Sequence, residues 1–176
     1  MTLIIVEVWS YIQLPIIWWL FKRFARRNVL GEMMAGTMIG AFNEFATEPL
    51  WDYHLRLNIY KDTPLILVLG WGVMFTLVTF VSEKLYCRFL KKDRIEPYDK
   101  RIFLFDVLAG ALVCFPIETA CAKLGLWTYR WDRLAWDWGN IPVINMPLEA
   151  LFGYSLLMLV GPTFVRYWER PLEGGR

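Results

Sequence analysis

Hydrophobic residues fill five long stretches of the chain, and polar residues collect between them. The stretches cover about residues 3–21, 30–50, 64–82, 102–122 and 142–165. The third carries no charged residue between Pro64 and Ser82, and the fifth carries only Glu149. A run of about 20 apolar residues is long enough to cross a bilayer as a helix. The pattern therefore predicts an all-α membrane protein with five transmembrane helices in one domain, residues 1–176.

Composition and charge add a topology to this prediction. The 176 residues are 57% hydrophobic and 17% aromatic, which is too apolar for an ordinary soluble domain. The segments after the first and third stretches and the C-terminal tail hold 14 of the 19 lysines and arginines. Because cytoplasmic loops carry the excess of basic residues, we expect an outside N-terminus and a cytoplasmic C-terminus. The net charge of +2 thus reports topology and gives no reason to expect nucleic-acid binding.

Two parts of the chain resemble each other and follow one extra helix. These repeat-like halves cover about residues 30–82 and 102–166, and each is expected to form a helix, an outer loop and a second helix. Both copies run in the same direction. Parallel repeats in membrane proteins are related by a pseudo-twofold axis along the membrane normal. The sequence therefore predicts an internal repeat that places equivalent residues across such an axis.

Each half carries a stripe of small residues that ends at an acid. Gly36 and Gly40 precede Glu44 at steps of four, and Gly110 precedes Glu118 by the interval that separates Gly36 from Glu44. Residues four apart stay on one face of a helix. Small residues on such a face let membrane helices approach closely. We therefore expect both glutamates to point into the bundle and away from lipid.

A Trp-x-Tyr triplet follows each of these acids, and a proline then precedes the next helix. The triplets are Trp51-Asp52-Tyr53 and Trp127-Thr128-Tyr129, and the prolines are Pro64 and Pro142. If these two prolines correspond, Trp71 and Glu149 occupy nearly equivalent places in the two halves.

Three acids, Glu44, Glu118 and Glu149, lie inside apolar stretches, where ionisable groups are costly and point to function. With a rise of about 1.5 Å per residue, all three fall within about one helical turn in depth, in the outer half of the membrane. Glu48 lies one turn beyond Glu44, and Asn145 lies one turn before Glu149. We expect a buried acidic pocket in which Glu44, Glu118 and Glu149 are the catalytic carboxylates.

Aromatic residues of the outer loops and the third stretch are expected to wall this pocket. Besides Glu48 and Asn145, the residues assigned to substrate binding are Trp51, Tyr53, Trp71, Trp127 and Tyr129. Trp136 and Trp138 are more typical of an interfacial aromatic belt. A protonated carboxyl group can donate a proton to an alkene, and aromatic faces attract the resulting carbocation. A second carboxylate can remove a proton or help water to capture the cation, so a lipid-soluble polyene from the bilayer is the natural substrate.

The run Pro147-Leu148-Glu149-Ala150-Leu151-Phe152 resembles the Pro-x-Glu-Glu-x-x-Phe signature of membrane-embedded lycopene cyclase domains. The runs Gly125-Leu126-Trp127-Thr128-Tyr129 and Gly139-Asn140-Ile141-Pro142 are similar to that family and to related carotenoid hydratases. The resemblance covers the second to fifth stretches. It implies cofactor-free, proton-initiated cyclisation or hydration of a carotenoid or other terpenoid, with Glu149 as the catalytic acid. Ala150 departs from the family's second acid, so Glu44 or Glu118 would have to supply that carboxylate.

Two other interpretations stay open. Glu44 and Glu118 could bond to Asn43, Thr119 or aromatic side chains and merely fasten the bundle. The chain could also bind or transport a small lipophilic or cationic ligand, since acids and aromatic rings together attract cations. His54 is the only histidine, which excludes a haem or zinc site built from several histidines. We expect no metal or cofactor; the expected partners are an isoprenoid from the bilayer and membrane lipid, and an oligomer is compatible with the sequence.

Three further acids receive local interpretations. Glu7 is expected near the outer surface, where its side chain can reach the headgroups, and Glu32 marks the inner start of a helix. Asp106 lies near the inner end of the fourth stretch, where it is either solvated or a counter-charge to Arg101.

Overall fold

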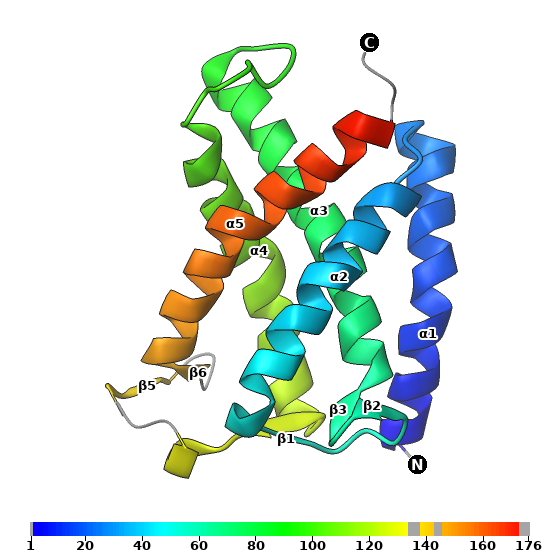
Figure 1. The fold of residues 1–176 in the computed structure, drawn as a ribbon, viewed down its shortest axis with the longest axis vertical. Coiled ribbons are helices and arrows are strands. Elements are labelled where there is room, and N and C mark those ends of the chain that lie inside the picture. The colour runs from blue at the N-terminus through cyan, green and yellow to red at the C-terminus, as the bar shows by residue number, and fades with distance from the viewer. Residues whose placement is uncertain (1, 134–137, 143–145, 173–176) are drawn as a thin grey trace.

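The structure, a computed structural model, describes residues 2–133, 138–142 and 146–172, and in these ranges it contains five α-helices (Figure 1). They are α1 (Thr2–Leu20), α2 (Leu30–Thr47), α3 (Leu65–Leu90), α4 (Ile102–Lys123) and α5 (Leu148–Leu172). A π-helical turn, η1 (Phe21–Ala25), continues α1. The remaining elements are short strands and 3-10 turns in the loops. The prediction of a mostly helical chain with five helices is confirmed.

Four segments of the described chain form helices that are long and apolar enough to cross a membrane. They are Leu3–Ala25, Leu65–Leu90, Ile102–Lys123 and Leu148–Trp168. The predicted second span, α2, is not among them, because Glu32, Asn43 and Glu44 lie within its 18 residues and lower its mean hydropathy. The membrane character predicted from the sequence thus holds for four of the five helices on length and composition.

The ends of two helices differ from the prediction, and a proline explains the first difference. The second stretch was expected to reach residue 50, but α2 ends at Thr47, and the 3-10 turn η2 (Glu48–Leu50) follows it. Pro49 has no amide hydrogen and cannot extend a helix through its interior. The third stretch was expected to end at residue 82, whereas α3 continues to Leu90.

The start of α5 corrects the expected correspondence between the two halves. The fifth stretch was expected to begin at residue 142, but β5 (Asn140–Ile141) and β6 (Met146–Pro147) pair as a short antiparallel ladder before the helix. Pro147 therefore stands directly before α5, as Pro64 stands directly before α3. Pro142 is not the proline that begins this helix.

The helices form a bundle in which α3 is the most enclosed member. Helices α2 and α5 lie side by side on one face with α3 and α4 behind them, and α1 stands at the edge beside α3 (Figure 1). In the most apolar window of α3, 56% of residues are buried, against 6% in α1. The short strands gather at the end of the bundle where the N-terminus lies, and α5 ends at the opposite end (Figure 1).

Glycines set the close packing of α2 on α3 and of α4 on α5. A Cβ added to Gly36 would lie 3.0 Å from the Gly72 Cα, and one on Gly40 would lie 2.2 Å from the Trp71 Cβ. On α4, a Cβ added to Gly110 would lie 2.4 Å from the Met158 Cγ. The prediction that small residues allow these helices to approach closely is confirmed.

The two Trp-x-Tyr triplets lie side by side. They form β1 (Trp51–Tyr53) and β4 (Trp127–Tyr129), which pair antiparallel with Trp51 opposite Tyr129 and Tyr53 opposite Trp127. A second ladder joins β2 (Asn58–Tyr60) to β3 (Thr63–Pro64) just before α3. The β1–β4 ladder thus fixes the ends of α2 and α4 to each other, next to the residues that follow Glu44 and Glu118.

An ionic network crosses the other end of the bundle. Arg27 pairs with Glu32 and, at 2.6 Å, with Glu83. Arg166 on α5 pairs with Asp106 at 2.6 Å and lies 3.6 Å from Glu83. Glu32 and Asp106 are completely buried. The network therefore links the connection between η1 and α2, which carries Arg27, to α2, α3, α4 and α5. Glu32 is a buried partner of Arg27 as well as a residue of the first turn of α2.

The predicted surroundings of Asp106 are wrong, and the Glu7 side chain is buried where it was expected to reach the surface. Asp106 is neither solvated nor paired with Arg101, because Arg166 and Ser82 hold its carboxylate in the interior. Arg101 pairs with Asp99 instead. Glu7 is buried, and its Oε1 accepts the backbone N–H groups of residues 56 and 57 at 3.2 and 3.1 Å.

Candidate functional site

Glu44 is fixed by two aromatic donors from its own half of the chain. The Tyr53 hydroxyl donates to Oε2 at 2.5 Å, and the Trp71 Nε1 donates to Oε1 at 2.6 Å. The residue is only 6% exposed. Each carboxyl oxygen therefore has a donor, and Glu44 joins α2 to β1 and α3.

Glu118 is fixed in the same manner by three donors. Trp127 Nε1 and the Tyr129 hydroxyl donate to Oε1 at 3.0 and 2.8 Å. The Tyr154 hydroxyl donates to Oε2 at 3.0 Å. Glu118 therefore joins α4 to β4 and α5. The sequence suggested bonds to aromatic groups as one way to satisfy this acid, and these are the bonds that form.

The loop tyrosines that bind these acids stay protonated. Burial raises the pKa of the Tyr53 phenol, and the charge of Glu44 raises it further. Burial likewise raises the pKa of the Tyr129 phenol, with Glu118 adding to the effect. A phenol whose charged form is disfavoured in this way remains a hydrogen-bond donor. The two tyrosines therefore serve as donors to their carboxylates.

Glu149 differs from the other two acids because one of its oxygens is free. Its Oε1 accepts the backbone N–H of Trp138 at 2.6 Å. Its Oε2 is buried and has no hydrogen-bond partner within the described residues. Buried polar atoms are nearly always hydrogen-bonded, and each exception calls for an explanation such as a ligand or a catalytic role. Glu149 is therefore the acid best placed to meet a ligand.

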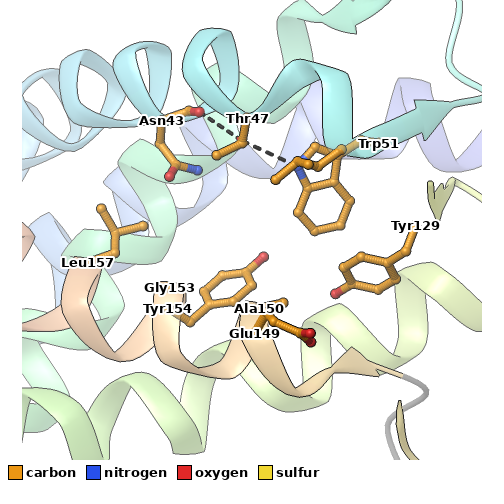
Figure 2. Close-up of a pocket in the computed structure, with 10 residues that line it drawn as sticks. Asn43, Thr47, Trp51, Tyr129, Glu149, Ala150, Gly153, Tyr154 and Leu157 are labelled. Atoms are coloured by element: carbon orange, nitrogen blue, oxygen red, sulfur yellow. Dashed lines mark hydrogen bonds between the residues drawn. The ribbon is translucent and has the colours of Figure 1, made fainter. Parts of the chain in front are cut away.

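Glu149 lines a cavity of about 200 Å³ between α2 and α5 (Figure 2). The cavity is bounded by Asn43, Thr47, Leu50, Trp51, Tyr129, Glu149, Ala150, Gly153, Tyr154 and Leu157. Asn43, Thr47 and Trp51 form one side, α5 forms the other, and Tyr129 closes one end (Figure 2). Gly153 is exposed, so the cavity reaches the surface along the seam between α2 and α5.

The three acids do not line one chamber as expected. Glu149 lines the cavity, whereas Glu44 and Glu118 stand behind its wall, because aromatic side chains occupy the space in front of them. Of the predicted binding residues, Trp51 and Tyr129 line the cavity. The others, Tyr53, Trp71 and Trp127, are donors to the buried acids. Asn145 lies outside the described residues.

Glu48 belongs to an ionic group above the cavity. Lys61 Nζ lies 2.8 Å from its Oε2, and this hydrogen bond lowers the pKa of the Glu48 carboxyl. Close by in the loops, Arg130 pairs with Asp62 at 2.8 Å and its backbone N–H donates to the Leu50 carbonyl. These contacts hold the loop that carries Trp51 against the strand that carries Tyr129.

The sequence analysis did not identify Tyr154 or Asn43 as residues that line the cavity. Tyr154 lies seven residues after Pro147, as Trp71 lies seven residues after Pro64. Pairing the correct prolines would therefore have matched Trp71 with Tyr154. The expected match of Trp71 with Glu149 is wrong for the same reason.

The seam between α3 and α4 lacks the carboxyl group that α5 provides. Ile66, two residues after Pro64, stands where Glu149 stands two residues after Pro147. Ile66 belongs to a buried cluster with Tyr53 and Trp127, and four residues of α1 pack against it: Leu3, Val6, Tyr11 and Leu14. One side of the bundle is therefore filled by α1 and apolar side chains, and the other side holds an acid and a cavity.

Comparisons of the chain with family models, curated proteins and solved structures find no match. No group of three or more metal-ligating side chains is found within the described ranges. Function is therefore inferred from Glu149, its cavity and the aromatic residues around it.

Proposed function

We propose that the chain is an integral-membrane isoprenoid cyclase or hydratase in which Glu149 donates a proton to a carbon–carbon double bond. The observation that carries this proposal is the buried, unpartnered Oε2 of Glu149 at an aromatic cavity. An ionised oxygen buried without a partner is far costlier than a neutral acid. The proposal assigns the acid O–H of Glu149 to this unpartnered oxygen, which faces the ligand.

The walls of the cavity suit a carbocation. Trp51, Tyr129 and Tyr154 present aromatic rings to it, and a cation near such a ring is stabilised by the negative face of the π system. Glu118 lies behind the two tyrosines and orients both by accepting their hydrogen bonds, without touching the ligand. Preorganised groups of this kind stabilise charge that develops during a reaction.

The size of the cavity limits what enters it. Its volume of about 200 Å³ is below the roughly 300–1,000 Å³ of pockets that enclose whole drug-sized ligands. One end group of a long isoprenoid would occupy the cavity, and the rest would lie along the seam between α2 and α5 in the bilayer. The substrate class is therefore a linear lipid with a reactive alkene at its end.

We further propose that α2 crosses the membrane as the fifth span, with the N-terminus outside. Its two acids, Glu32 and Glu44, are buried and hydrogen-bonded inside the bundle, which removes the cost of facing lipid. The antiparallel β1–β4 ladder and the matching places of Trp71 and Tyr154 support an internal repeat. The excess of basic residues at the opposite end supports a cytoplasmic C-terminus.

The resemblance to lycopene cyclase domains also supports Glu149 as the proton donor. Glu149 is the acid of the Pro147-Leu148-Glu149 run and lies in the first turn of α5. Ala150 lines the cavity where that family carries its second acid. Among the described residues, Glu118 is the only other acid whose carboxyl group is hydrogen-bonded to side chains that line the cavity, through Tyr129 and Tyr154.

The second candidate is a non-catalytic binder or transporter of a lipophilic or cationic ligand. It is favoured by the hydrogen bonds of Glu44 and Glu118, which satisfy both acids within the protein. On this account these acids fasten the bundle, and Glu149 alone contacts the ligand.

A vesicle assay separates the two candidates. The purified protein is reconstituted with lycopene or other acyclic isoprenoids, and the lipids are analysed by absorption and mass spectrometry. An enzyme yields a product with a changed chromophore or mass, and saturable binding or uptake without a product supports the second candidate. Mass spectrometry of lipids that co-purify with the protein selects the substrates to test.

A further inference from the structure

The cavity combines apolar walls with a small set of polar groups, and two of these groups have no hydrogen-bond partner in the part of the chain that the structure describes. We infer that the cavity holds a water molecule as co-substrate, that the reaction is a hydration, and that Asn43 and Tyr154 position this water while Glu118 receives its proton. The inference rests on the proposed function and specifies its reaction and co-substrate.

Most polar groups of the lining are already engaged. The Thr47 hydroxyl donates to the backbone carbonyl of Asn43 at 2.8 Å and accepts from the Trp51 Nε1 at 3.3 Å. The hydroxyls of Tyr129 and Tyr154 both donate to Glu118. These groups have no free hydrogen to offer a ligand.

Two polar groups remain. Within the described residues, the side-chain amide of Asn43 has no hydrogen bond, and neither has Oε2 of Glu149. A hydrocarbon would leave both groups unsatisfied after it displaced solvent, which costs about 1–3 kcal/mol for each buried group. A site for a pure hydrocarbon reaction gains nothing from the amide. An oxygen-bearing reactant is therefore indicated.

Asn43 and Tyr154 offer a water molecule polar partners on the two walls of the cavity. Asn43 on α2 and Tyr154 on α5 extend into the cavity from opposite sides (Figure 2). The Asn43 amide offers both a donor and an acceptor, and the Tyr154 oxygen can still accept while its own hydrogen is committed to Glu118. A bound water needs two to four polar partners and about 30 Å³, which the cavity supplies beside an end group.

The residues then complete a balanced reaction. Glu149 gives its proton to one alkene carbon, whose π electrons form the new C–H bond and leave the neighbouring carbon as a cation. The water oxygen forms a C–O bond to that cation and releases a proton to the Tyr154 oxygen. Tyr154 simultaneously gives its phenol proton to Oε2 of Glu118, 3.0 Å away. The alkene and water become an alcohol, and solvent that enters after product release returns the proton from Glu118 to Glu149.

Reconstituted protein with lycopene in water labelled with heavy oxygen tests this inference. We expect an alcohol product that carries the label. Tyr154→Phe keeps the ring but removes the relay, and Asn43→Leu keeps the approximate volume but removes the amide. Each should lower the alcohol yield by about a hundredfold, the scale of general acid–base catalysis, and should raise the share of unlabelled isomerised or cyclised products. Tyr167→Phe, an exposed tyrosine of the same helix, is the matched control and should behave as the unaltered protein.

The possible outcomes distinguish a failure of the hydration from a failure of the proposed function. An unlabelled cyclic hydrocarbon from the unaltered protein would overturn the hydration but keep Glu149 as the proton donor. Labelled alcohol formed at full rate by both variants would overturn the roles of Asn43 and Tyr154. No product from any isoprenoid would overturn the proposed function and this inference with it. If Tyr154→Phe does not elute as a monodisperse protein, the inference is tested by the activity of Asn43→Leu and by the heavy-oxygen label in the alcohol.

Discussion

Trp71 and Tyr154 stack on each other, with ring centroids 6.0 Å apart and an interplanar angle of 29°. Each follows the proline before its helix by seven residues, and each donates a hydrogen bond to the glutamate of its own half, Glu44 or Glu118. Tyr154 also lines the cavity, whereas Trp71 does not. Trp71 is therefore a residue of the core, and Tyr154 also forms part of the cavity wall.

Filling the cavity should stop function without harming the fold. A Cβ added to Gly153 meets nothing within 4 Å, and Gly153 lines the cavity. We expect Gly153→Leu to abolish product formation or ligand binding while the thermal midpoint in detergent changes little. Gly70, six residues after Pro64 as Gly153 is after Pro147, also has open space beside it and supplies the control Gly70→Leu. Equal activity of the two variants would show that the ligand does not use this cavity.

The packing of α2 on α3 should be intolerant of one added methyl group. A Cβ on Gly40 would lie 2.2 Å from the Trp71 Cβ, so either the helices or the indole must move. Overpacking of this kind costs about 1–3 kcal/mol, and we expect Gly40→Ala to lower the free energy of unfolding by that amount. Gly70→Ala, measured in the same unfolding titration, should be neutral or slightly stabilising. A neutral Gly40→Ala would mean that α2 and α3 pack less closely than described.

The hydrogen bond of Tyr53 should contribute to stability. Tyr53→Phe leaves Oε2 of Glu44 without its donor in a buried place. The cost of an unsatisfied buried acceptor is about 1–3 kcal/mol, which should appear as a lower unfolding free energy. Tyr98→Phe, at a fully exposed tyrosine, is the control and should have no effect. A stable Tyr53→Phe protein would indicate that another group reaches Glu44.

The buried pair of Asp106 and Arg166 should show strong coupling. Replacing either residue by leucine leaves the other charge buried with fewer partners, and such losses typically cost about 3–5 kcal/mol. Replacing both by leucine removes the uncompensated charge, so the double variant should be less destabilised than the sum of the single variants. A double-variant cycle in a denaturant titration measures this. Additive losses would mean that the two side chains do not interact.

The helices and their close contacts could be predicted from the sequence because they depend on local patterns. Apolar stretches of span length located all five helices, and steps of four from Gly36 to Glu44 placed that acid inside the bundle. The triplets at Trp51 and Trp127 were linked to these acids, although their pairing as strands was not foreseen. Hydropathy alone does not identify α2 as a membrane span, because its polar residues lower its mean hydropathy and their partners are known only from the fold.

The composition of the cavity could not be predicted because it depends on which donors reach which acids. The depth of Glu44, Glu118 and Glu149 suggested a shared chamber, since depth along a helix says nothing about intervening side chains. Trp71 and Tyr154 intervene, and only Glu149 keeps a free oxygen. The choice of the wrong proline then hid Tyr154.

The replacement Glu149→Gln asks whether this carboxyl group supplies the proton. Glutamine keeps the shape and can still accept the Trp138 N–H, but it cannot donate the acid proton. With an isoprenoid that the unaltered protein converts, we expect product formation to fall by at least about a hundredfold while the protein remains folded and monodisperse. Glu96→Gln, at an exposed acid of the α3–α4 loop, should retain full activity. Product formation by Glu149→Gln at the unaltered rate would contradict the assignment of Glu149 as the proton donor.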